Sequence, residues 1–427
     1  MYRAVIVTVA ALACVAALST TSAFGATADA AGNWPQWRGP AADGVAPKAT
    51  PPVEWAEDRN IRWKVAAPGA GHASPIVWGD RIYLLSAAES PTDSSKVQYL
   101  VLALSRQNGE TVWERVAREA PPHEGVHGTS TRASGSAITD GQQVYASFGS
   151  QGVYCYDMDG HPQWETDLGD MRTRNEFGEG ASPALHGDRL VVPWDHEGES
   201  FIVALDTATG DEVWRQGREE RTSWNTPLIV EHDGRVQVIV NATNLIRSYD
   251  LADGSPLWQS SGMTANAIPS PVHADGTVYV MSGFRGSALL AIDLDSAQGD
   301  ITDGDAVVWS KSRDTPYVPS PLLYGGTLYY VKGNSGILSA LDSATGDALY
   351  PAQRLAGVRE VYSSPVAADG RVYLASRDGG TVVLQDGGDF TVLATNVLDD
   401  GFSATPALVD GEIYLRGHEY LYCIAEE

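Results

Sequence analysis

Short runs of alternating apolar and polar residues recur along this chain, and a tight turn precedes most of them. Residues 81–85 follow a Gly-Asp pair, and residues 277–280 follow an Asp-Gly pair. Such pairs between alternating runs are a strong hairpin signal, because glycine tolerates a positive φ. The period of two predicts β-strands joined by hairpins, with no helix longer than a turn or two.

These strands belong to a repeat of roughly 45 residues, and a repeat of this length specifies the whole architecture. Each unit opens with a hydroxyl residue, which precedes proline in all units but the second. The eight openings are at Ser74, Ser136, Ser182, Thr226, Ser270, Ser320, Ser364 and Thr405. In the second unit, Gly135-Ser136 occupies the place of the Ser-Pro pair.

An aromatic residue marks the fourth strand of each unit. It recurs at Trp63, Trp113, Trp164, Trp214, Trp258, Trp309 and Tyr350. The eighth place, near Ala394, has lost it. Because four antiparallel strands make one blade, the repeat predicts an all-β protein, an eight-bladed β-propeller of four-stranded antiparallel blades.

The two ends of the repeat region predict how the ring closes. Residues 61–66 form a fourth strand that precedes the first opening, and the final unit stops after a third strand at 420–424. We expect the N-terminal strand to complete the last blade, which removes two sheet edges that would invite aggregation.

Residues 1–28 have the composition of a targeting segment. A positive start and an apolar run lead to Ala-Thr-Ala at 26–28, a small-x-small cleavage site. We expect a signal peptide at 1–28, an N-terminal extension at 29–53 and the propeller at 54–427, in a periplasmic or extracellular protein. Lipidation at Cys14 is the alternative, and only then do we expect membrane association.

The charge balance bears on partners. Acidic residues outnumber basic ones by 54 to 29, which gives a formal net charge of −25. Such a surface repels phosphate backbones, so nucleic acid is not expected as a partner. We expect a monomer.

Residues 204–214 carry the pattern Ala-x-Asp-x-x-Thr-Gly-x-x-x-Trp in full. This pattern resembles the tryptophan-docking repeat of propellers of the pyrroloquinoline-quinone (PQQ) type, which include quinoprotein alcohol dehydrogenases and BamB-type assembly lipoproteins. The resemblance covers residues 54–424 and implies the eight-bladed fold. The segments 34–40 and 175–183 are similar to a narrower group of secreted bacterial proteins with this repeat, whose function is mostly unassigned.

The resemblance to quinoprotein dehydrogenases also implies groups that this chain lacks. Those enzymes need two adjacent cysteines, a Ca²⁺ ion held by Glu, Asn and Asp, and an Asp base. Here the cysteines are Cys14, Cys155 and Cys423, and none is adjacent to another. We therefore expect no PQQ and no other cofactor, while a metal ion is left open.

One motif has the letters of a zinc site. His123-Glu124-x-x-His127 fits His-Glu-x-x-His, which requires a helix to bring both imidazoles to one metal. The Pro-Pro at 121–122 and the glycine at position 125 argue for a loop. Two readings stay open: a metal or polar site built from this loop, or two histidines that bond to backbone or water.

The connectivity of a four-stranded meander sorts the loops onto two faces. Loops between second and third strands share one face with the blade-to-blade connections. This face should receive a charged set from the second and third blades: His123, Glu124, His127, Arg172, Arg174, Asn175, Glu176, Glu179, Asp195 and His196. Function gathers on loops held by a rigid scaffold, although a solvated acidic rim without a ligand is the alternative.

A second set lies just before the first strands, where the chain reaches the channel mouth. Its members are Trp224, Asn225, Asn266, Tyr317 and Tyr362. Aromatic rings and amides around a funnel suit sugar or peptide binding, through stacking and hydrogen bonds. The alternative is that these side chains pack on one another and plug the channel.

These observations predict an exported, non-enzymatic binding or scaffold propeller that recognises a protein, peptide or glycan on its loop face. The alternative is an enzyme, either metal-dependent or a quinoprotein-type oxidoreductase, that uses the His/Glu/Asp cluster of blades two and three.

Overall fold

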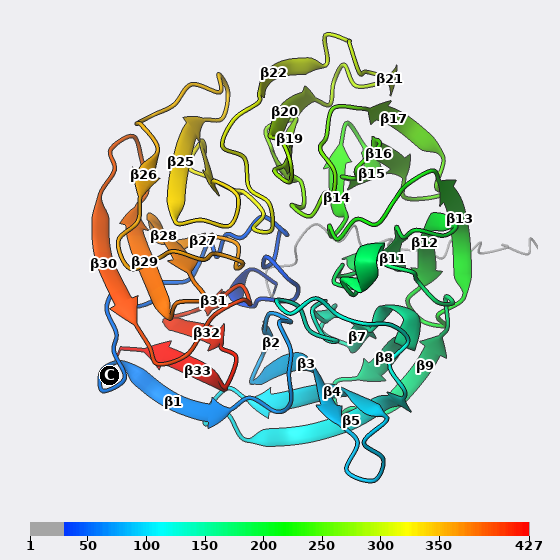
Figure 1. The fold of residues 1–427 in the computed structure, drawn as a ribbon, viewed down its shortest axis with the longest axis vertical. Helices are drawn as coiled ribbons and strands as arrows, with labels where there is room; N and C mark the ends of the chain where they lie inside the picture. The colour runs from blue at the N-terminus through cyan, green and yellow to red at the C-terminus, as the bar shows by residue number, and fades with distance from the viewer. Residues whose placement is uncertain (1–29, 427) are drawn as a thin grey trace, which may run out of the picture.

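The computed structural model describes residues Ala30–Glu426, and it confirms the eight-bladed propeller. Eight antiparallel sheets surround a central axis in chain order (Figure 1). The predicted signal peptide and Cys14 lie outside the described residues. Within the described range, no helix has the length and apolar character needed to cross a bilayer.

Each blade runs from an inner to an outer strand. Blade 1 comprises β2 (Ile76–Trp78), β3 (Arg81–Glu89), β4 (Val97–Ser105) and β5 (Thr111–Ala120), and blade 2 comprises β6 (Ile138–Thr139), β7 (Gln143–Ser147), β8 (Val153–Asp157) and β9 (Pro162–Thr166). Blade 3 comprises β10 (Ala184–His186), β11 (Arg189–Trp194), β12 (Ser200–Asp206) and β13 (Glu212–Arg218), and blade 4 comprises β14 (Leu228–His232), β15 (Arg235–Val240), β16 (Ile246–Asp250) and β17 (Pro256–Ser260).

The second half of the ring repeats this order. Blade 5 comprises β18 (Val272–Ala274), β19 (Thr277–Ser282), β20 (Ala288–Asp293) and β22 (Val307–Lys311), and blade 6 comprises β23 (Leu322–Tyr324), β24 (Thr327–Val331), β25 (Ile337–Asp342) and β26 (Gln353–Arg354). Blade 7 comprises β27 (Val366–Ala368), β28 (Arg371–Ala375), β29 (Gly380–Gln385) and β30 (Val392–Val397), and blade 8 comprises β31 (Ala407–Val409), β32 (Glu412–Arg416), β33 (Tyr420–Ala425) and β1 (Ile61–Ala66).

Only short elements depart from this scheme in the described chain. Three single-turn 3-10 helices are η1 (Ala30–Gly32), η2 (Gly149–Gln151) and η3 (Arg174–Glu176). In blade 5, the connection before β22 sends out a short strand, β21 (Gly299–Asp300), which pairs in parallel with β17. Blade 4 is therefore five-stranded.

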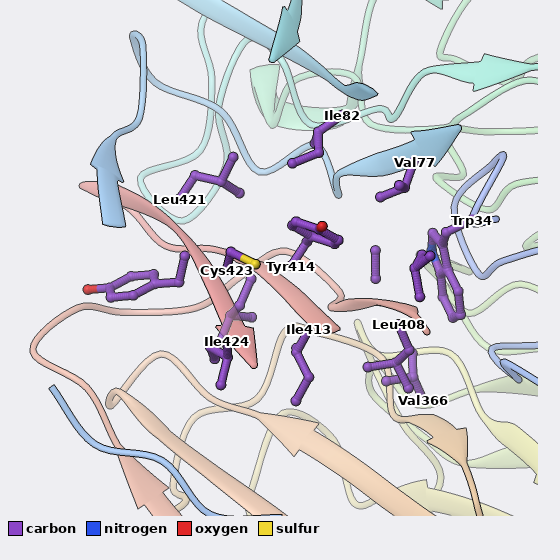
Figure 2. Close-up of a cluster of buried hydrophobic side chains, with 14 of the residues drawn as sticks. Trp34, Val77, Ile82, Val366, Leu408, Ile413, Tyr414, Leu421, Cys423 and Ile424 are labelled. Atoms are coloured by element: carbon purple, nitrogen blue, oxygen red, sulfur yellow. The ribbon is translucent and has the colours of Figure 1, made fainter. Parts of the chain in front are cut away.

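Blade 8 closes the ring as predicted, because β1 pairs antiparallel with β33. The register places Trp63 opposite Cys423 and Ala66 opposite Tyr420. Behind this junction, a core cluster joins blade 8 to its two neighbours. Figure 2 shows side chains of blade 8 packed among Ile82 and Val77 of blade 1 and Val366 of blade 7. Closure thus pairs the facing edges of β1 and β33, which would otherwise be exposed.

Five tryptophans of the fourth strands fasten their blade to the next one. Their indole N–H groups donate to carbonyls of the following blade's third-to-fourth turn, with N···O distances from 2.8 to 3.1 Å. The pairs are Trp63–Arg106, Trp113–Met158, Trp164–Thr207, Trp214–Leu251 and Trp309–Ser343. Trp258 differs, since its indole bonds to Gln237 of its own blade.

A closed ring of hydrogen bonds surrounds the channel, and we call it the hydroxyl ring. The backbone N–H of each opening Ser or Thr donates to the hydroxyl of the next blade's opening residue, at 2.8 to 3.1 Å. The donors are Ser74, Ser136, Ser182, Thr226, Ser270, Ser320, Ser364 and Thr405, and the last donates to Ser74. The hydroxyl residue of the repeat is therefore the inner fastening of the ring.

The N-terminal extension crosses one face of the ring, near its centre in Figure 1. Trp34 forms a bridge with Val77 of β2, and the amide of Thr50 donates to the carbonyl of Asp410, in a first-to-second strand turn. The extension therefore lies on the face of the Asp-Gly turns. Arg38 is buried and donates to the Pro321 carbonyl at 2.6 Å.

Candidate functional site

Most of the predicted residues that line a hollow on the loop face belong to two hollows with different linings, while His196 lines a third, more open one beside the second-to-third strand loop of blade 3. The first is a cavity of about 60 Å³ between blades 2 and 3, lined by His123, Glu124, Glu179 and Asp195 among others, and we call it the carboxylate cavity. The second is a pocket of about 380 Å³ on the channel axis, which we call the channel pocket. The predicted charged set thus contributes mainly to the first hollow and the predicted aromatic set mainly to the second, although Trp224 lines both and His127 lines the channel pocket.

Within the carboxylate cavity, Glu124 is held by neighbouring groups of the protein. Its carboxylate accepts the backbone N–H of Thr173 at 3.1 Å and also the Thr173 hydroxyl. Its backbone carbonyl accepts a bond from the Arg132 guanidinium at 2.9 Å. The two Thr173 bonds tie the blade 1–2 connection to the blade 2–3 connection, and the Arg132 bond braces the blade 1–2 connection internally.

Glu179 is the most perturbed acid of this cavity. Burial raises its pKa to about 7, although bonds from the hydroxyl and amide of Ser150 lower it and the nearby Glu124 raises it. The amide bond measures 2.7 Å. A carboxyl group with this pKa can exchange a proton near neutrality, and that is the one property here that suits acid–base chemistry.

Asp195 belongs to a buried ion pair. The Arg218 guanidinium binds both of its oxygens, at 2.6 and 3.0 Å, and the Ser223 hydroxyl adds a bond at 2.7 Å. The two side chains are 1% and 0% exposed. Arg218 also donates to the hydroxyl of Tyr249 at 2.8 Å. Every Asp195 oxygen therefore has a partner within the protein.

The His-Glu-x-x-His segment is a loop, and its two histidines serve different hollows. His123 lies 2.6 Å from the Met171 carbonyl through Nε2 and lines the carboxylate cavity. His127 lies 2.8 Å from the Thr129 hydroxyl through Nδ1 and lines the channel pocket. Residues 30–426 contain no group of three or more His, Cys, Asp or Glu side chains placed to hold a metal ion.

The other charged candidates line neither hollow. Arg172 donates to the Glu197 carbonyl at 2.9 Å, and Arg174 donates to the Asn266 side chain at 3.3 Å. His196 is buried and accepts the Arg172 amide at 2.9 Å. The neighbours Asn175 and Glu176 have positive φ values of 51° and 55°, and Glu176 accepts the Gly125 amide at 3.3 Å.

The channel pocket has an apolar wall and a polar wall. Blades 4 to 7 supply the apolar wall: Trp224, Ile268, Phe284, Tyr317, Val318 and Tyr362. Blades 8, 1, 2 and 3 supply small and polar residues, namely Ser403, His72, Ser130, Ser134 and Gly180, and one aromatic ring, Phe177, which lies beside Trp224. The small residues leave the volume open, because bulky side chains in their places would fill it.

Aromatic rings of the apolar wall are held in place at their edges. The Trp224 indole donates to the Gly178 carbonyl at 2.7 Å, and Tyr317 stacks on Phe284 with centroids 4.9 Å apart. The predicted amides are buried behind the lining: Asn225 and Asn266 belong to neither hollow, although Asn266 donates to the Tyr317 hydroxyl at 3.5 Å. The three predicted aromatics are thus together in the pocket, and the two amides are not.

The pocket ends at the hydroxyl ring, where Trp37 of the extension closes it. The Trp37 indole donates to the Thr405 hydroxyl at 3.2 Å, and six of the eight ring hydroxyls line the pocket. Trp37, Phe177 and Phe284 were not among the predicted residues. Trp37 carries no repeat signal, and the two phenylalanines lie in loops whose path the sequence pattern does not determine.

No charged side chain lines the channel pocket. Its titratable residues are histidines and tyrosines, and burial lowers the pKa of His72 to about 3, helped by His418, Arg377 and Arg416 nearby. His72 is therefore neutral at physiological pH. In a chain of net charge −25, an uncharged pocket is a local exception.

This lining does not fit PQQ, the cofactor that the resemblance to quinoproteins implies. The quinone carries several carboxylates, which need cationic partners in a low-dielectric site. The pocket offers none, and no metal-holding group exists in the described range to replace the Ca²⁺ site. Neither Cys155 nor Cys423 belongs to the pocket.

Comparisons with known proteins agree with this architecture. The sequence matches the family described as outer membrane protein assembly factor BamB, over residues 53–198, 150–300 and 198–427. No curated protein matches the sequence. Among solved structures, BamB from Moraxella catarrhalis is 14% identical, with a TM-score of 0.58 over 84% of this chain and 98% of that chain.

Two further structures show the same fold. The quinohemoprotein alcohol dehydrogenase from Comamonas testosteroni is 12% identical, with a TM-score of 0.65 over 93% of this chain and 81% of that chain. The computationally designed Ika8 protein is 11% identical, with a TM-score of 0.55 over 84% of this chain and 100% of that chain. At such identities these likenesses concern the fold alone.

Proposed function

The chain belongs to the BamB-type family of PQQ-like β-propellers, and from this premise we propose that it is an exported binding protein without catalytic activity. Its ligand, a peptide or a glycan, enters the channel pocket from the loop face. The family's description as an assembly factor supports a binding role, and the periplasmic or extracellular location follows from the expected signal peptide.

The observation that carries this proposal is that the channel pocket has more groups free to contact a ligand than the carboxylate cavity has. The acids of the carboxylate cavity bond to neighbouring protein groups, so that hollow offers little to a ligand. The channel pocket instead exposes aromatic faces, and its volume of about 380 Å³ lies within the roughly 300–1,000 Å³ of small-ligand sites. A rigid scaffold also limits the entropy lost on binding.

An enzyme is the second candidate, and the raised pKa of Glu179 favours it. The size of the carboxylate cavity opposes it, since about 60 Å³ holds only a few water molecules. If the site were catalytic, Glu179→Gln would abolish turnover and leave binding intact. A purified protein that oxidises alcohols in the presence of PQQ and Ca²⁺ would also support the enzyme.

A thermal-shift screen of the purified protein tests the binding proposal. Uncharged oligosaccharides and uncharged peptides serve as probes, with PQQ plus Ca²⁺ as a third arm. A ligand that binds only the native state raises the melting temperature by mass action. Stabilisation by a saccharide or peptide, but not by PQQ, is the expected result. Stabilisation by PQQ alone would replace the proposal with the quinoprotein alternative.

A further inference from the structure

The hydroxyl ring leaves hydrogen-bond donors unused at the floor of the channel pocket. Each ring hydroxyl accepts one backbone amide, and Thr405 also accepts the Trp37 indole. A Ser or Thr hydroxyl has in addition one proton to donate. For the ring members that line the pocket, no acceptor is present within residues 30–426. The floor therefore offers converging O–H donors.

The walls above this floor are of opposite character. Rings of Trp224, Tyr317 and Tyr362 occupy the side of blades 4 to 7, while Ser403 and His72 lie on the other side. The His72 imidazole contacts His418, with centroids 5.4 Å apart, and has no hydrogen bond within the described chain. A matching ligand has one apolar face and several hydroxyl groups.

Charge narrows the ligand further. An anion would meet no cationic side chain in the lining and would have to approach a protein of net charge −25. A cation would find no carboxylate in the lining to pair with it, and Arg377 already lies over the Tyr362 ring, 4.7 Å from its centroid. A purely apolar ligand would displace the water that bonds to these hydroxyls and would offer no hydrogen bond in return.

We infer that the channel pocket binds a neutral saccharide. One sugar ring stacks on the aromatic wall at Trp224 and Tyr317, and its hydroxyl groups accept bonds from the hydroxyl ring. A pyranose has the required shape, with an apolar face of C–H groups and a rim of hydroxyls. This inference rests on the proposed binding function and specifies its ligand class.

Isothermal titration calorimetry on the purified protein tests the inference. The probes are maltotriose, cellotriose, laminaritriose, xylotriose and triacetylchitotriose, each at millimolar concentration. We expect at least one to bind with one-to-one stoichiometry. Trp224→Ala and Tyr317→Ala should each weaken that binding at least about tenfold, because each removes a stacking face.

Two further variants separate stacking from folding. Trp224→Phe keeps an aromatic face but loses the bond to Gly178, so it should retain affinity to within a few fold. Phe390→Ala removes an aromatic side chain outside the pocket and should leave affinity unchanged. Circular dichroism of every variant checks that it is folded. Equal weakening by Trp224→Phe and Trp224→Ala would assign Trp224 a structural role and overturn the stacking argument.

The remaining outcomes distinguish this inference from the function on which it rests. If no saccharide binds but a pool of uncharged peptides does, and Trp224→Ala abolishes that binding, the saccharide inference fails and the binding function stands. If neither class binds, both fail. Saccharide binding that survives Trp224→Ala and Tyr317→Ala would place the site elsewhere and overturn the inference.

Discussion

The carboxylate cavity and the channel pocket lie side by side on one face, yet they use their polar groups in opposite ways. In the cavity, Asp195 is fully bonded to Arg218 and Ser223, and Glu124 is bonded to Thr173. In the channel pocket, no charged side chain is present, the ring hydroxyls that line it have no acceptor for their protons, and the His72 imidazole has no hydrogen bond within the described residues. The charged residues of these loops therefore hold the loops to one another, whereas the uncharged aromatic and hydroxyl residues form the accessible site.

The largest expected effect tests whether the cavity is structural. Asp195→Ala leaves the buried Arg218 guanidinium without its carboxylate. Breaking a buried pair by removing one partner costs about 3–5 kcal/mol of unfolding free energy. Urea denaturation measures this loss. In the exposed pair of Arg81 with Asp80, at 3.2 Å, Asp80→Ala is the matched control and should cost no more than about 1 kcal/mol.

A small loss in Asp195→Ala, equal to that of the control, would mean that Arg218 is satisfied by other groups. The ion pair would then not be needed for folding, and the contrast between the two hollows would disappear. The double variant Asp195→Ala/Arg218→Met sharpens the measurement. It removes the stranded charge, so it should recover part of the lost stability.

The second effect concerns the boundary of the channel pocket. Ser182→Ala removes the hydroxyl that accepts the Ser136 amide at 2.9 Å. A buried backbone N–H left unpaired costs about 1–3 kcal/mol, and the ring loses one of its fastenings. Ser182→Thr keeps the hydroxyl and should restore most of the stability. If both variants unfold at the wild-type denaturant concentration, the hydroxyl ring does not stabilise the fold.

A third, pH-dependent effect sharpens the cavity's side of the comparison. The folded-state pKa of Glu179 is raised from 4.5 to about 7, so folding favours the protonated acid. Its contribution is complete below pH 4.5 and is lost as pH rises through about 7. Glutamine stays neutral, so Glu179→Gln should melt a few degrees above wild type at pH 8. Melting curves at pH 4 and pH 8 measure the difference, which should vanish at pH 4. A difference that is independent of pH would contradict the raised pKa of Glu179.

The smallest expected effect on stability lies in the channel pocket. Phe284 is half-buried and touches Tyr317 across the pocket wall. We expect Phe284→Ala to cost no more than about 1.5 kcal/mol, the range of an aromatic pair, because its ring is not packed in a core. Urea denaturation measures this too. A cost of Phe284→Ala as large as that of Asp195→Ala would show that the aromatics plug the channel as a second core.

The sequence was sufficient for the ring but not for the two hollows. The eight opening hydroxyls and the fourth-strand aromatics predicted every blade, because each blade depends on local turns and on contacts with its neighbours. Asp195 looked accessible, since nothing in the chain pairs it with Arg218 at the end of another strand. Burial of that pair follows from how two strands meet in space.

The empty volume of the channel pocket could not be predicted from the sequence either. It depends on small residues such as Gly180 and Ser134 facing the aromatic wall, and on Trp37 reaching the channel from outside the repeat. A periodic pattern predicts where a strand starts, but it does not report which side chains leave space unfilled. Trp224, Tyr317 and Tyr362 were identified because they precede first strands, whereas Phe284 lies in a loop with no such position.

Ring closure by β1 also sets a delay between the synthesis of this strand and the synthesis of its partner. Arg62 of β1 and its ion-pair partner Glu412 are 350 positions apart. At roughly 5–20 residues per second, synthesis of the intervening chain takes about 20–70 s. Throughout this interval β1 has no partner strand. Its apolar residues Ile61, Trp63 and Val65 make the unpaired segment prone to aggregation. Arg62 and Lys64 interrupt that segment with charge, which disfavours pairing with a strand of another molecule. In the finished ring the same two side chains bind Glu412 and Glu57.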